Sequence, residues 1–138
     1  MRRAFTLMEL IIVVIIIGIL AAIGLPQFFR VAERGRAAEG VAALGAFRGS
    51  QLRYAAEAGT TTADEDALDV ETLTLKYFGD PVGTGAVNVR TSPNSTIVSV
   101  TRNAVNNPSF GAYVLSIQAD GDITCSGGTG SACTYIGY

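Results

Sequence analysis

The chain begins with a long apolar run that a single charge interrupts. Predominantly apolar residues extend from Phe5 to Leu25, and these 21 residues are enough for a helix to cross a hydrocarbon core of about 30 Å. Glu9 is the only charged residue between Arg3 and Arg30. A carboxylate in such a run is costly in lipid unless it has a partner. The pattern predicts a membrane-spanning helix that carries one functional acid.

Helical spacing continues beyond the apolar run, but here charges alternate with apolar positions. The recurring apolar positions are Ala37, Val41, Leu44, Phe47 and Ala55. They predict an amphipathic helix that buries one stripe against a head and stops at Gly59. Gly18, Gly24 and Pro26 are weak points, because glycine disfavours helix interiors and proline removes a backbone hydrogen bond. A kink between the membrane helix and the amphipathic helix is one explanation for them.

The last third of the chain has the pattern of short antiparallel strands, rich in Val, Ile, Thr and Tyr. The candidate strands are 86–91, 97–102, 112–118, 122–125 and 133–136. Asp120-Gly121 separates two of them and is a hairpin signal. A long helix followed by such a meander predicts an α+β fold with a small antiparallel sheet as its head.

An acidic segment joins the helix to the strands. Its carboxylates are Asp64, Glu65, Asp66, Asp69 and Glu71. Their spacing matches no calcium-loop template, so a solvated face is the favoured interpretation. Turn chemistry likewise explains Asp120 and Asp122 better than a metal site does.

Composition argues against catalysis and against nucleic-acid binding. The chain has no histidine, which is the commonest general base and a common metal ligand, so we expect no enzyme activity, no metal and no cofactor. The net charge is −2 and Lys76 is the only lysine, whereas phosphate binding requires clustered cations. An exported enzyme or binding domain anchored by its signal is therefore disfavoured.

Cys125 and Cys133 are the only cysteines, and they enclose a loop rich in glycine and serine. Outside the cytoplasm thiols tend to oxidise, so we expect a disulfide that closes this loop. A zinc site would need more ligands than the neighbourhood offers, and a redox role favours closer cysteines.

The basic pair Arg2-Arg3 places the N-terminal end in the cytoplasm and the rest of the chain outside. An ordinary cleavable signal peptide is the alternative, with a loose cleavage site at Ala22–Gly24. A carboxylate inside the apolar region and the shortness of the leader weigh against it. The order of elements across Arg2–Leu10 and Gly18–Pro26 instead resembles the N-terminus of type IV prepilins.

The resemblance implies specific processing of the N-terminus. In that family a prepilin peptidase removes a short basic leader and methylates the new first residue, which implies a cut between Ala4 and Phe5. The family normally has glycine immediately before the cut, and this chain has Ala4. The new amine of Phe5 would lie four residues before Glu9, on the same helix face. By resemblance, Glu9 pairs with the Phe5 amine of an adjoining subunit, and Thr6 helps to position it.

The resemblance also implies an organisation and a function. The expected segments are a leader (1–4), a transmembrane or filament-core helix (5–27), an amphipathic helix (28–59) and a globular head (60–138). The expected function is that of a type IV pilus subunit, held in the bacterial inner membrane and polymerised by the assembly machinery into an extracellular filament. The segment from Gly18 to Pro26 would then lose helical structure on assembly, and the disulfide loop would be a variable surface region.

The alternative within this class is a type II secretion pseudopilin, which shares the N-terminal motif. The loop between Cys125 and Cys133 and the lack of a clear calcium-ligand cluster favour the pilin. Motility, adhesion and DNA uptake are all activities of type IV pili. The aromatic residues along the helix are packing groups rather than evidence for a conductive filament.

Overall fold

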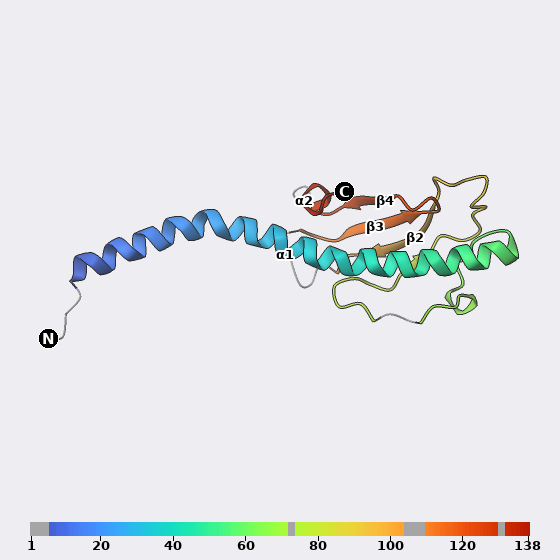
Figure 1. Ribbon diagram of the computed structural model, residues 1–138, viewed down its shortest axis with the longest axis horizontal. Helices are drawn as coiled ribbons and strands as arrows, with labels where there is room; N and C mark the ends of the chain where they lie inside the picture. The colour runs from blue at the N-terminus through green and yellow to red at the C-terminus, as the bar shows by residue number, and fades with distance from the viewer. Residues whose placement is uncertain (1–5, 72–73, 104–109, 130–131) are drawn as a thin grey trace. The chain divides into compact units, whose positions relative to one another are not determined.

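The computed structural model describes residues 6–71, 74–103, 110–129 and 132–138. In chain order its elements are α1 (Leu7–Ala58), a 3-10 turn η1 (Glu65–Ala67), β1 (Val82–Gly83), β2 (Thr96–Thr101), β3 (Tyr113–Gln118), β4 (Ile123–Gly127) and α2 (Ala132–Ile136) (Figure 1). The chain divides into two compact units, Met1–Glu33 and Arg34–Tyr138, and α1 contributes to both. The predicted α+β fold, with a long N-terminal helix and an antiparallel sheet, is confirmed.

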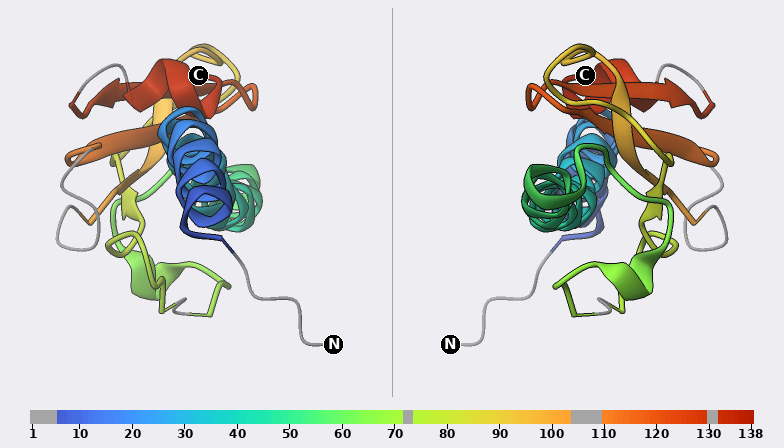
Figure 2. Two further views of the ribbon diagram at one scale, coloured as in Figure 1. Left: turned by 90° about the vertical axis from the view of Figure 1, so that its left-hand side faces the viewer. Right: turned by 90° about the vertical axis from the view of Figure 1, so that its right-hand side faces the viewer.

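The sheet of the second unit is a simple meander. Its four strands follow the order β1-β2-β3-β4, and each neighbouring pair is antiparallel. The central strand β3 pairs Leu115 with Val100 of β2 on one side and with Cys125 of β4 on the other. Viewed along the helix, the strands lie on one side of the part of α1 that belongs to this unit (Figure 2). The result is a helix layer on a sheet layer.

The core lies between these two layers. In β3 every second residue is buried, which places Tyr113, Leu115 and Ile117 on the face toward the helix. α1 supplies Leu44 and Phe47, which are 0% and 3% exposed, to the same cluster. These helix residues belong to the stripe that the spacing predicts.

The hairpin between β3 and β4 lies where Asp120-Gly121 predicts it. The Gly121 amide donates to the Gln118 carbonyl over 3.1 Å, and the Gln118 amide donates to the Asp122 carbonyl over 2.9 Å. Gly121 has φ 109°, a conformation that L side chains rarely adopt. The side chain of Asp120 accepts from the Asp122 amide, so this carboxylate serves the turn.

Two predicted strands are wrong. Residues 133–136 belong to the helix α2, because Ala132 and Ile136 are both buried and their four-residue separation suits a helix rather than a strand. Residues 86–91 form no strand, because the Asn88 side chain accepts from the amides of Arg90 and Thr91 and turns the chain there. The two-residue strand β1 was not predicted.

Asp69 attaches the acidic segment to α1 through hydrogen bonds. Its carboxylate accepts from the Ser50 hydroxyl over 2.6 Å and from two nitrogens of Arg53 over 2.7 Å each. The hydrogen bond from Arg53, and to a smaller extent the one from Ser50, lowers the pKa of Asp69 to about 2. The hydrogen bond to Asp69 also raises the pKa of Arg53. This bidentate pair fixes the path of the chain after it leaves α1.

Candidate functional site at the N-terminal segment

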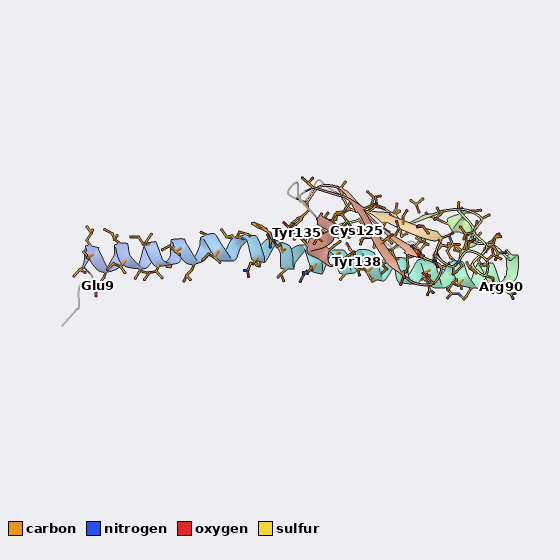
Figure 3. The ribbon with its side chains drawn as sticks, turned by 90° about the horizontal axis from the view of Figure 1, so that it is seen from above. Glu9, Arg90, Cys125, Tyr135 and Tyr138 are labelled. Carbon is orange, nitrogen blue, oxygen red and sulfur yellow. A yellow bond between two sulfur atoms is a disulfide. The ribbon has the colours of Figure 1, made fainter. Side chains whose placement is uncertain are left out.

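Thr6 and Glu9 form a reciprocal cap at the start of α1. The Glu9 amide donates to Thr6 Oγ1 over 3.2 Å, and the Thr6 amide donates to Glu9 Oε2 over 3.1 Å. The Thr6 hydroxyl donates to the same carboxylate oxygen over 2.9 Å. This is a capping box, in which two amides that lack helical partners are satisfied by side chains. Glu9 is marked in Figure 3 near the beginning of the helix.

The side chains that follow Glu9 form an exposed apolar surface. From Leu7 to Val31 the large apolar side chains are between 49% and 76% exposed. Single exposed apolar residues are ordinary, but a continuous surface of this length requires an apolar environment or a partner. α1 is long and apolar enough to cross a membrane, a property that secretory signals share.

Gly18, Gly24 and Pro26 all lie inside α1, which continues through them to Ala58. A Cβ atom added at either glycine would meet no atom within 4 Å. The packing within this chain therefore does not require glycine at these two positions.

Ala4 and Phe5, the predicted cleavage and methylation positions, lie outside the described residues. Of the three residues predicted to act in assembly, Thr6 and Glu9 lie within the described residues and Phe5 does not.

The predicted disulfide between Cys125 and Cys133 is present. It joins β4 to α2, and Arg34 Nε donates to the Tyr135 carbonyl over 2.6 Å, which joins α2 to α1. Cys125, Tyr135 and Tyr138 lie at the same end of the second unit, far from Arg90 at the other end (Figure 3). The C-terminal segment is therefore held from both sides.

Within the described ranges, no group of three or more Asp, Glu, Cys or His side chains is arranged to hold a metal ion. Two carboxylates of the acidic segment have other roles, because Asp64 accepts from the Asp66 amide in a turn and Asp69 pairs with Arg53.

Comparison with known proteins decides what kind of chain this geometry belongs to. Residues 1–25 match the family model described as the prokaryotic N-terminal methylation motif. The fimbrial protein EcpC of Eikenella corrodens is 36% identical over 86 residues, which are 62% of this chain and 56% of that protein. The chain carries a prepilin-like N-methylation motif and is homologous to a fimbrial protein. The relative is described as a fimbrial protein, which is a structural protein, and the family model describes the motif alone.

The pilin-like chain thus spans little more than half the length of this relative. The matched motif includes Thr6 and Glu9, the two residues of the capping box. Sequence analysis assigned Thr6 a role only by resemblance and missed the cap itself. The signal was present, because threonine followed three residues later by glutamate at the start of an apolar run marks a capping box.

Proposed function

We propose that this chain is a structural subunit of a type IV pilus. A prepilin peptidase cuts between Ala4 and Phe5 and methylates the new amine. The subunit then waits in the bacterial inner membrane, and the pilus assembly machinery polymerises it into an extracellular filament. The observation that carries this proposal is the methylation motif on a helix whose apolar side chains lie exposed from Leu7 to Val31.

Polymerisation of such a helix needs more than apolar contact. Lipid and a bundle of neighbouring helices are both apolar, so the transfer between them releases little hydrophobic free energy. Specific packing and charge pairing must supply the order. We assign the pairing to Glu9 and the Phe5 amine of an adjoining subunit. The hydrogen bonds from Thr6 hold the carboxylate until that amine replaces them.

The remaining segments take roles that follow from this assembly. Residues 1–4 are the leader, 5–27 the transmembrane and filament-core helix, 28–59 the amphipathic helix and 60–138 the head. The segment from Gly18 to Pro26 would lose helical structure in the filament and let it stretch. Glycine lowers helix stability by about 1 kcal/mol relative to alanine, which favours local unwinding there.

The test uses two substitutions of Glu9. Glu9→Gln keeps an oxygen that accepts the hydrogen bonds of Thr6 but removes the charge, whereas Glu9→Ala removes both. If pairing with the amine drives assembly, both variants accumulate in the membrane with methylated Phe5 and neither forms filaments. Mass spectrometry of the N-terminus and electron microscopy of the cells provide the two measurements.

Thr6→Ser is the matched control, because it keeps the hydroxyl of the cap, and we expect normal filaments from it. Abundant normal filaments from Glu9→Ala and Glu9→Gln would refute the proposal. Short periplasmic fibres in place of long extracellular ones from the wild-type chain would favour the secretion pseudopilin.

A further inference from the structure

We propose that a pocket on the head receives the side chain of Lys76 from a second copy of this chain, so that heads join head to tail. The acidic pocket is lined by Phe47, Glu65, Asp66, Leu68 and Val70. The inference rests on the proposed function, since the repeated contact is one within a filament.

The acidic pocket suits a long cationic side chain. It has a volume of about 330 Å³, and the half-buried Leu68 and Val70 form a small apolar wall in a lining that is otherwise mostly polar. Glu65 and Asp66 are exposed, and within the described part of the chain neither carboxylate forms an ion pair. Lysine combines an apolar stem with a charged head, so it can cover the wall and reach the carboxylates at once.

Lys76 is a suitable donor for this pocket. It is the only lysine and is exposed, and its ammonium has no carboxylate partner among the residues that the structure describes. The ammonium lies 5.2 Å from the ring centroid of Tyr77, and the Arg36 guanidinium lies at the same distance from that ring. The Arg102 guanidinium lies 5.5 Å from the same ring centroid, so three cations surround it. Of these, the exposed ammonium of Lys76 presents positive charge to an approaching carboxylate.

Glu39 does not neutralise this positive charge by an ion pair with Lys76. Its two carboxylate oxygens accept from the backbone amides of Lys76 and Tyr77, over 2.8 and 2.9 Å. These hydrogen bonds attach the backbone of Lys76 and Tyr77 to α1 beside Glu39, and they do not involve the Lys76 ammonium.

The two surfaces lie at different levels of the same helix. Lys76 is attached beside Glu39, while the acidic pocket lies against Phe47, eight residues further along α1. At 1.5 Å per residue, this separates the two levels by about 12 Å. A contact between two different surfaces of the same protein is heterologous. When the rotation that relates neighbouring subunits does not close a ring, such a contact repeats into a helical filament.

A divalent cation is the competing occupant. Calcium takes six to eight oxygen ligands, and within the described residues no group of three or more Asp, Glu, Cys or His side chains is arranged to hold a metal ion. An ammonium requires only one or two carboxylates and a surface for its stem, and the acidic pocket provides these.

Charge reversal tests the contact in cells that assemble the wild-type chain. The variants are Lys76→Glu, the pair Glu65→Lys with Asp66→Lys, and the combination of all three. Each one-sided reversal places like charges together and should lower the yield of sheared filaments at least ~10-fold relative to subunit in the membrane fraction. The combination should restore most of the yield. Arg90→Glu is the control, because Arg90 is also exposed but lies beside Gly59 at the end of α1.

Unchanged yields from both one-sided reversals would overturn the inference, as would a combined variant that fails to recover. Loss of wild-type filaments on treatment with a chelator would assign the acidic pocket to a divalent cation instead. A wild-type chain that forms no filaments would refute the proposed function itself, a result visible before any variant is compared.

Discussion

Glu9 already has hydrogen-bond partners within its own chain. Its carboxylate accepts from the amide and the hydroxyl of Thr6. One oxygen of this acid is thus hydrogen-bonded at the first turn, where the helix dipole also favours negative charge. The assembly role that we propose for it depends, by contrast, on an amine that would appear only after cleavage behind Ala4. In that proposal the same residue would serve the intact chain as a cap and the processed chain as an ion-pair partner.

The bond between Asp69 and Arg53 makes stability depend on pH in a defined range. The folded state lowers the Asp69 pKa from 3.8 to about 2, so the contact stabilises the fold above pH 3.8. This contribution is lost as the pH falls through about 2. We expect Asp69→Asn to lower the melting temperature slightly at pH 7, because the pair is 59% and 62% exposed and screened by water. The difference from the wild type should vanish near pH 2.

Thermal unfolding followed by circular dichroism at several pH values measures this effect. Asp66→Asn is the control, since among the described residues Asp66 has no cationic partner. A difference between Asp69→Asn and the wild type that persists unchanged at pH 2 would contradict the assignment.

Single residues of the candidate site could be found from the sequence when their chemistry is unusual for their surroundings. Glu9 is a charge in an apolar run, and Cys125 and Cys133 are an isolated pair. The pairing of Asp69 with Ser50 and Arg53 could not be found in this way, because it joins segments that only the folded chain brings together.

At the scale of elements, α1 contains two glycines, Gly40 and Gly45, that differ in the space available for a larger side chain. A Cβ added at Gly40 would lie 2.9 Å from the Phe78 ring, closer than real Cβ contacts allow. A Cβ added at Gly45 would meet nothing within 4 Å. We expect Gly40→Ala to lower the free energy of unfolding by about 1–3 kcal/mol through overpacking. Gly45→Ala should raise it by up to about 1 kcal/mol through helix propensity.

Both variants have the same change in composition, so each is the control for the other. Chemical denaturation of the two proteins gives the two free energies. Equal effects of the same sign would show that Phe78 does not restrict the helix at Gly40.

The elements that the sequence predicts correctly are those with a long or regular pattern. The apolar run and the amphipathic stripe predict α1, and alternation predicts β3. The elements that the sequence predicts wrongly or misses are short. Residues 133–136 have strand-like composition but complete a core through Ala132 and Ile136, so tertiary burial overrides local preference. The two residues of β1 are too few to leave any pattern.

At the scale of the whole molecule, the second unit contains its own core. Helix residues such as Leu44 and sheet residues such as Leu115 belong to one buried cluster within Arg34–Tyr138. We expect a protein that begins at Arg34 to fold without detergent, because the exposed apolar surface from Leu7 to Val31 is then absent. Its free energy of unfolding should be about 5 kcal/mol or more, as for other small domains.

Thermal and denaturant unfolding of this fragment test the prediction, with its disulfide intact. A single cooperative transition is the expected result. A fragment that stays aggregated, or that melts without cooperativity, would show that the second unit needs the first in order to fold.

The edges of the sheet have a consequence for the filament that we propose, in which copies of the chain would be crowded together. Open strand edges offer unpaired amides and carbonyls on which other chains can form cross-β aggregates. Here one outer strand, β1, has two residues, and the other, β4, ends at Gly127 and is tied by its cysteine to α2. Neither outer strand is a long flat template. In the filament that we propose, crowded copies would thereby be protected from amyloid-like association between their sheets.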